Sequence, residues 1–401
     1  MRREPAPEMA PCSNEDYQQL AARYRPLFRA IADGAVARET NRTPLHGPLR
    51  ELAAAGFTAL RVPRRHGGGG VSARHFFRLL VELAAAESNL AQALRAHICF
   101  VEDRLYFEDE TWLKRVAEGQ LVGNAVAASS GASGGGPTTL SPQGGKFILN
   151  GQKSYTTGSF YANWIQTKAE MPDGRSVTVM VDANAAGVEV HDDWDGFGQR
   201  LTASGTTDFN GVQVAEADLL PEEENLPFAA ALHQLVHVAT LAGISQRISE
   251  DVATEVRGRL RGLSEGTSPR LRTDPQIQQL VGELSASAFV AEAAALRVAG
   301  LLNEALRTQE RGNARGFRSL VTQMGIASYQ SQIIVTKLTQ DSATTMFTAL
   351  GASSVRQDLQ LDRHWRNARV LSSHSPVVYK SRVVGDWEIN GSIPTNLAAR
   401  R

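Results

Sequence analysis

A dense group of polar and aromatic residues occupies positions 153–164, where the sequence is Lys-Ser-Tyr-Thr-Thr-Gly-Ser-Phe-Tyr-Ala-Asn-Trp. The segment offers an aromatic ring at Tyr155 and hydroxyl groups at Thr157 and Ser159. Such residues suit a flavin, because its ring needs a flat wall while its N5 and carbonyl groups need hydrogen-bond partners. The same composition is equally typical of the polar end of a β-strand, so the segment alone leaves both interpretations open.

Two histidines are further candidates, because an imidazole can hold or release a proton near neutral pH. His97 lies in an apolar helical stretch, and His374 precedes a Ser-Pro pair at which a helix is expected to end. Taken alone, each is more typical of a helix histidine with satisfied nitrogens than of a catalyst. His233 and His237 have the i, i+4 spacing of metal ligands, but a third ligand and the zinc-protease Glu are missing, so we predict no metal site.

The composition excludes several classes of protein. The chain has 401 residues, with 42 Lys and Arg against 42 Asp and Glu, so nucleic acid and anionic membranes are not expected partners. Hydrophobic residues make up 42%, which is enough for a large core. Cys12 and Cys99 are too few for a disulfide scaffold. Without a secretory leader pattern or a long uninterrupted apolar run, a cytoplasmic protein is expected.

Three zones of the chain must position these residues. Helical periodicity extends to about residue 120, β-prone runs follow, and long apolar helices return after Pro227. The predicted parts are an N-terminal helical domain at 1–121, a middle β domain at 122–224, a C-terminal helical bundle at 225–374 and an extended tail at 375–401.

Glycine marks several expected turns and loops. Asn150-Gly151 lies between two β-prone runs and predicts a type I′ hairpin turn, which needs positive φ at both central residues. The glycine runs at 67–70 and 131–136 lack the flanking residues of a phosphate-binding loop or a dinucleotide fingerprint. Both are interpreted as loops.

The order of helices, β domain and bundle, with four motifs, resembles the acyl-CoA dehydrogenase superfamily over the whole chain. The motifs are the loop at 123–136, the stretch at 150–164, Gly-Gln-Arg-Leu-Thr-Ala-Ser-Gly-Thr at 198–206 and Asp-Arg-His-Trp-Arg-Asn-Ala-Arg at 362–369. The resemblance implies an α+β fold with an N-terminal all-α domain, a middle β-barrel or sandwich domain and a C-terminal four-helix bundle. It also implies a flavin site that includes Ser129, Tyr155, Thr157, Ser159 and Arg363, with Thr157 beside N5.

The chain departs from the dehydrogenases at their catalytic base. These enzymes carry a Glu shortly after an Arg-Asp-Ala segment, and it removes the α-proton of the acyl thioester. Counted from Arg366, that position is Ser375, and no carboxylate occurs from 363 to 385. In these departures the chain resembles the flavin monooxygenase branch of the superfamily, which includes dibenzothiophene monooxygenase.

Enzymes of that branch receive reduced FMN from a separate NAD(P)H:flavin reductase, form a C4a-(hydro)peroxyflavin with O₂ and oxygenate a small organic substrate. The resemblance then implies that His97 and His374 handle the peroxide proton and that Ser159 lies near N5 or the peroxide. The resemblance favours FMN over FAD, because dehydrogenases hold the adenine half with an Arg and a Phe-Gly, and the segment at 261–272 has no Phe-Gly. A homotetramer is also implied.

Two other functions remain open on the sequence. One is an acyl-CoA dehydrogenase or oxidase whose base has moved, with Glu102 and Asp103 as the nearest candidates. The other is a non-catalytic protein with a flavin-enzyme fold, against which the retention of the candidate site residues argues.

Overall fold

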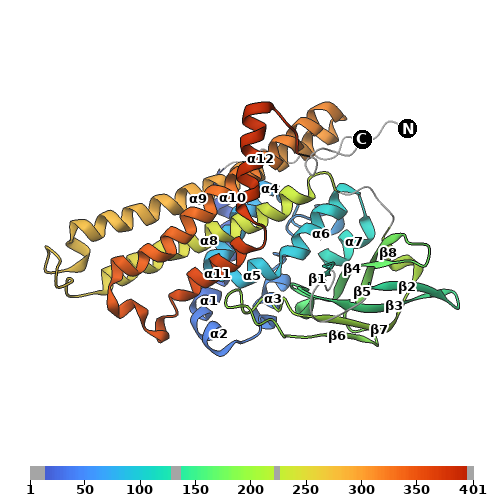
Figure 1. Ribbon diagram of the computed structural model, residues 1–401, viewed down its shortest axis with the longest axis horizontal. Helices are drawn as coiled ribbons and strands as arrows, with labels where there is room; N and C mark the ends of the chain where they lie inside the picture. The colour runs from blue at the N-terminus through green and yellow to red at the C-terminus, as the bar shows by residue number, and fades with distance from the viewer. Residues whose placement is uncertain (1–13, 128–136, 221–225, 395–401) are drawn as a thin grey trace.

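The N-terminal zone is helical, as predicted. The computed structural model describes residues 14–127, 137–220 and 226–394 (Figure 1). Ser72 caps one helix by accepting a hydrogen bond from the His75 N–H, and Asp109 caps another through Trp112. The helices are α1 (Asn14–Asp33), α2 (Ala35–Asn41), α3 (His46–Ala54), α4 (Ala73–Ala86), α5 (Ser88–Ala93), α6 (Arg95–Tyr106) and α7 (Glu110–Ala117).

The middle zone is one sheet of eight strands within the described residues. Its order is β6-β7-β3-β2-β4-β5-β8, and β1 pairs in parallel with β4, Val122 lying opposite Trp164. Buried side chains such as Leu140, Leu149 and Ile165 form its own core. The strands are β1 (Val122–Ala125), β2 (Thr139–Gln143), β3 (Lys146–Lys153), β4 (Trp164–Glu170), β5 (Ser176–Asp182), β6 (Val188–Val190), β7 (Thr207–Val214) and β8 (Leu219–Leu220).

The predicted hairpin turn at Asn150-Gly151 is wrong. Strand β3 continues through both residues, and the turn to β2 falls at Gly144-Gly145 instead. The register of β3 against β7 shifts between Leu149 and Gly151, so the pair forms an irregularity inside a strand. Gly151 is required there, because its φ is +140° and a Cβ would lie 2.6 Å from Cα of Thr138.

The C-terminal zone is a helical bundle of α8 (Ala229–Gly258), α9 (Pro275–Glu310), α10 (Ala314–Leu350) and the shorter α11 (Asp362–Ser373). Figure 1 shows α8, α9 and α10 running side by side away from the sheet. Helix α4 packs against α8 and α9, so the bundle shares one core with the N-terminal helices. The predicted α+β class, with helices before and after a β domain, is confirmed.

The predicted extended tail is also wrong over most of its described length. Residues Val377–Asn390 form helix α12, which begins after Pro376 and ends at Gly391 in the left-handed region. Proline is tolerated at a helix start, because the first N–H groups have no partner inside the helix. Its apolar residues Val383, Val384 and Trp387 pack on Ile326 and Tyr329 of α10.

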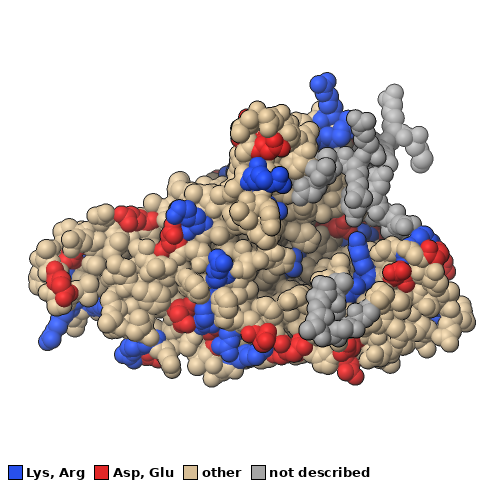
Figure 2. Space-filling model, in the orientation of Figure 1, with Lys and Arg blue, Asp and Glu red and all other residues tan. Residues whose placement is uncertain are grey.

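Charged side chains of both signs are interspersed over the face shown in Figure 2, as expected for a chain with no net charge. Among the described helices, α9 alone is long and apolar enough to cross a membrane by length and composition, a test that core helices also pass. Only 39% of its most apolar stretch is buried inside the chain.

Candidate active site

Ser159 opens a short 3₁₀ turn, Ser159–Tyr161, between β3 and β4. Its side chain is 1% exposed, and its Oγ has no hydrogen-bond partner among the described atoms. Two glycines hold the turn closely. A Cβ on Gly123 of β1 would lie 2.5 Å from Cα of Ser159, and one on Gly158 would lie 2.3 Å from the carbonyl oxygen of Ala93. The hydroxyl is therefore fixed by backbone on two sides while its own hydrogen bond is unused.

The residues before this turn are held by the segment 202–205. Thr157 Oγ1 lies 2.8 Å from Oγ of Ser204, and the hydroxyl of Thr156 donates to the carbonyl of Gly205 at 3.1 Å. Tyr155 has a positive φ of 57° and is 65% exposed, with its ring edge-on to Trp194. The predicted cofactor segment thus presents an open aromatic ring, while its threonines brace the turn.

His97 does not have the free nitrogen that its predicted proton role requires. Its buried Nε2 lies 3.0 Å from the carbonyl oxygen of Thr58, and its Nδ1 accepts the Val122 N–H at 3.3 Å. Burial lowers the pKa of His97 to about 4, so the ring is neutral at pH 7. In this arrangement His97 ties α6 to the first residue of β1, and we regard it as a positioning residue.

Buried neutral histidines predict a specific acid sensitivity. Burial lowers the pKa of His97 and of His364 from 6.5 to about 4. Between these values the unfolded chain binds protons that the folded chain does not, so the free energy of unfolding falls as the pH falls from about 6.5 to about 4. Urea titrations at a series of pH values measure this slope, and His97→Gln is expected to reduce it. A slope that is unchanged in the variant would contradict the assignment to His97.

His374 belongs to a cluster with residues of α6 and α8. Its ring centre lies 4.6 Å from that of His237, edge to face. Arg95 donates from Nη1 to Nδ1 of His233 at 3.3 Å, and Cys99 Sγ lies 3.4 Å from the same nitrogen. Desolvation and the Arg95 charge lower the pKa of His233 to about 3 and that of His374 to about 4. The histidines are therefore neutral around a buried guanidinium.

No metal site forms from His233 and His237 within the described residues. The group of three possible ligand atoms found there, all within 4.8 Å of one another, is Glu189, His191 and Asp208 at the β6–β7 edge of the sheet. His191 is already paired with Asp208 at 2.8 Å, and Glu189 is exposed. We assign no function to this group.

Of the two remaining predicted cofactor residues, one can be placed in the structure. Ser129 lies outside the described residues. Arg363 of α11 is buried, and its guanidinium donates to the carbonyl of Gln360 at 2.9 Å and lies 3.4 Å from Asp251. Arg363 therefore has protein partners, and its contact with a cofactor remains a prediction.

Glu102, the candidate for a moved dehydrogenase base, is engaged elsewhere. Its carboxylate is 0% exposed and receives two hydrogen bonds from Arg61, one of them at 3.0 Å from Nη2 to Oε2. Its neighbour Asp103 pairs with Arg104. Because the Glu102 carboxylate is buried against a guanidinium, it has no access to a substrate, so this alternative loses one of its two nearest candidates.

Glu102→Gln should destabilise the protein strongly. The change leaves the buried Arg61 guanidinium without its counter-charge, and breaking a buried pair from one side costs about 3–5 kcal/mol. The free energy of unfolding from urea titration measures the loss. Glu110→Gln is a control, because its pair with Lys114 is exposed and contributes little. Equal, small effects of the two changes would contradict this reading of the pair.

A pocket of about 260 Å³ opens beside the cluster, between the N-terminal helices, the sheet and the bundle. Cys99 and Phe100 of α6 and His233 of α8 form one side, and Asn124 and Lys168 of the sheet form another. It therefore joins all three zones of the chain.

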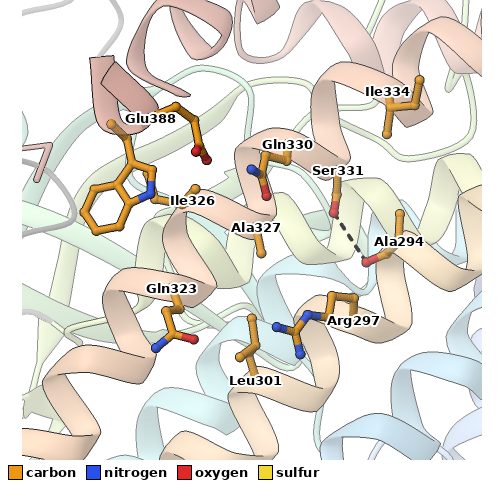
Figure 3. Close-up of a pocket in the computed structure, with 11 residues that line it drawn as sticks. Ala294, Arg297, Leu301, Gln323, Ile326, Ala327, Gln330, Ser331, Ile334 and Glu388 are labelled. Carbon is orange, nitrogen blue, oxygen red and sulfur yellow. Dashed lines mark hydrogen bonds between the residues drawn. The ribbon is translucent and has the colours of Figure 1, made fainter. Parts of the chain in front are cut away.

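A second groove lies on the outer face of the bundle, where α12 crosses α9 and α10 (Figure 3). Arg297, Ile326 and Trp387 are among its lining residues, and Ser331 donates to the carbonyl of Ala294 at 3.3 Å. None of the predicted site residues lines it.

The surroundings of Ser159 fit a flavin. The Ser159 hydroxyl, buried and without a partner among the described atoms, can serve a polar ring atom, and Tyr155 offers a flat wall. Sequence reasoning found these positions but missed Arg95, whose only signal was a charge within an apolar helix.

Comparisons with known proteins agree with this arrangement. Residues 14–120, 127–212 and 235–379 match the N-terminal, middle and C-terminal domains of acyl-CoA dehydrogenase. The chain is 26% identical to the probable FMNH2-dependent monooxygenase SfnC of Pseudomonas putida, covering 92% of this chain and 94% of that protein. It is 26% identical to a dibenzothiophene monooxygenase of Rhodococcus qingshengii, covering 90% of each.

Solved structures show the same likeness. The methanesulfinate monooxygenase MsuC of Pseudomonas fluorescens is 25% identical with a TM-score of 0.82, covering 96% of this chain and 100% of the other. TdsC of Paenibacillus sp. A11-2, in a complex with FMN and indole, is 25% identical with a TM-score of 0.85, covering 96% and 99%. The predicted resemblance is confirmed, and the chain belongs to the acyl-CoA dehydrogenase family, on its flavin-dependent monooxygenase branch.

Proposed function

We propose that this protein is a two-component monooxygenase that uses reduced FMN and O₂ to oxygenate a small organic substrate. The observation that carries the proposal is the buried, unpaired hydroxyl of Ser159, held by backbone in the segment that resembles the family's flavin contact. The relatives named above, one FMNH2-dependent and one solved with FMN and indole, support FMN as the cofactor. Reduced FMN would supply the electrons that activate O₂.

The chain's own residues have separate tasks in this proposal. Ser159 donates a hydrogen bond to the polar edge of the flavin ring, Tyr155 packs on the ring, and Thr157 fixes their segment through Ser204. His374, at the end of α11, exchanges the proton that the reaction needs through its neutral ring. The apolar helix α8 keeps water away, since water in such a site diverts reducing equivalents.

A direct test compares flavin reoxidation with and without the protein. Reduced FMN is mixed anaerobically with the protein, oxygenated buffer is added, and the return of oxidised-flavin absorbance and the release of hydrogen peroxide are followed. The proposal predicts that both are much slower than with free FMN. Reoxidation at the rate of free flavin would favour a dehydrogenase with bound FAD or a protein without catalysis.

We also infer a cytoplasmic homotetramer supplied by a separate NAD(P)H:flavin reductase. Support for the assembly comes from large apolar side chains left exposed on the bundle, where Phe289 is 75%, Val290 42% and Ile334 41% exposed. Light scattering gives the mass of the assembly, and a monomer at micromolar concentration would contradict this inference. A reducing compartment suits the buried free thiol of Cys99.

A further inference from the structure

Arg95 differs from the other buried arginines in the described part of the chain. Arg61 pairs with Glu102, Arg104 with Asp103 and Asp109, and Arg363 with Asp251. Arg95 is 9% exposed, and no described carboxylate lies within ion-pair distance of it. A buried charge without a counter-charge is costly, so such a guanidinium is expected to have a partner in the working protein.

The neighbours of Arg95 are neutral and have unused hydrogen-bonding capacity. Its Nη1 bonds to His233, while its Nε has no partner among the described atoms. His237, 3% exposed and one helical turn along α8, has an Nε2 to which no described atom is hydrogen-bonded. Neutral imidazoles can donate to an anion, and the guanidinium supplies both charge and two parallel donors.

The same group borders the pocket described above. His233 and Cys99 line that pocket, and His233 is hydrogen-bonded to Arg95. A small molecule that enters the pocket therefore lies next to a partner of Arg95. Phe100, Phe107 and Leu232 line it as well and suit an organic body attached to the anion.

We propose that Arg95, with His233 and His237, binds an oxyanionic group of the organic substrate, a carboxylate or a sulfinate. This inference rests on the proposed function and narrows its substrate class to small organic acids. The anion balances the guanidinium, and the pocket holds the rest of the molecule beside His233.

Calorimetric titration of the flavin-free protein tests the subsite separately from catalysis. The probes are benzoate and benzenesulfinate, with neutral benzamide for comparison. Arg95→Met should weaken binding of both anions about 10- to 100-fold, leave benzamide unchanged and keep the melting temperature, because it removes an unpaired buried charge. Arg95→Lys should retain part of the affinity. Lys168→Met is the control, since Lys168 is an exposed lysine that lines the same pocket.

Four outcomes would overturn the proposal. Equal anion affinity in the wild type and Arg95→Met excludes Arg95, and loss in Lys168→Met alone moves the anion to the sheet side. If phosphate or FMN competes fully with benzoate, and the aromatic ring of the probe adds no affinity over the anion alone, the site binds a flavin phosphate or an inorganic ion. Slow flavin reoxidation together with absent anion binding would leave the monooxygenase proposal intact and refute this one alone.

Discussion

Ser159→Ala should lower the yield of oxygenated product per FMN oxidised by about 100-fold, the cost typical of losing one preorganised donor. The melting temperature should not fall. Because Ser159 Oγ has no hydrogen-bond partner among the described residues, its removal breaks no hydrogen bond there and relieves an unsatisfied buried group. Product and hydrogen peroxide are quantified together, so that lost oxygenation is distinguished from lost flavin turnover.

Ser328→Ala is the matched control for that result. Ser328 is also buried, at 0% exposure, but its hydroxyl donates to the carbonyl of Gly325 at 2.7 Å within α10. This change should cost about 1 kcal/mol of stability and leave the product yield unchanged. A Ser159 variant with normal yield, or one that melts early like the control, would remove the main support for the proposed function.

Gly158→Ala should damage both stability and flavin use. The residue has a φ of +80°, and the added Cβ would lie 2.3 Å from the Ala93 carbonyl oxygen. Backbone atoms must move to relieve this clash. The left-handed conformation costs about 1–2 kcal/mol for alanine, and the contact adds about 1–3 kcal/mol of overpacking. The shift falls on the turn that carries Ser159. Urea titration and FMN affinity, measured by fluorescence, report the two effects.

Gly174→Ala separates the two causes. Gly174 has nearly the same φ, +82°, but a Cβ there would meet nothing within 4 Å. It should show the conformational cost alone and bind FMN normally. If both variants lost the same stability and kept the same FMN affinity, the close approach of Gly158 to the α5–α6 junction would not affect FMN binding.

Local patterns in the sequence predicted the elements more reliably than their ends. The β-prone zone that follows residue 120 contains strands such as β4, β5 and β7, because alternation of apolar residues indicates one buried face. Asn150-Gly151 misled because its two residues accept a bulge within a strand as readily as a hairpin turn, and only pairing with β7 decides between them. The predicted extended tail was wrong because Pro376 and Gly391 lie at the two ends of helix α12, positions at which proline and glycine are common.

For the candidate site as well, the sequence predicted which segment is involved but not the partners of its side chains. A motif predicted the segment of Tyr155, Thr157 and Ser159, but which hydroxyl is unpaired depends on partners far along the chain, such as Ser204 for Thr157. For His97, the interpretation from composition, a satisfied helix histidine, describes the geometry better than the catalytic role implied by resemblance. Nothing local marks Arg95 as unpaired, because lack of a counter-charge is a property of the folded surroundings.

The hydrogen bond from the Val122 N–H to His97 gives β1 a second use. This single amide belongs to the sheet, yet its acceptor is a side chain of the helical part, and the next residue, Gly123, touches Ser159. The amide proton of Val122 exchanges with solvent only when the sheet separates from α6. Deuterium uptake at Val122 therefore times that separation at one atom, independently of flavin, substrate or product.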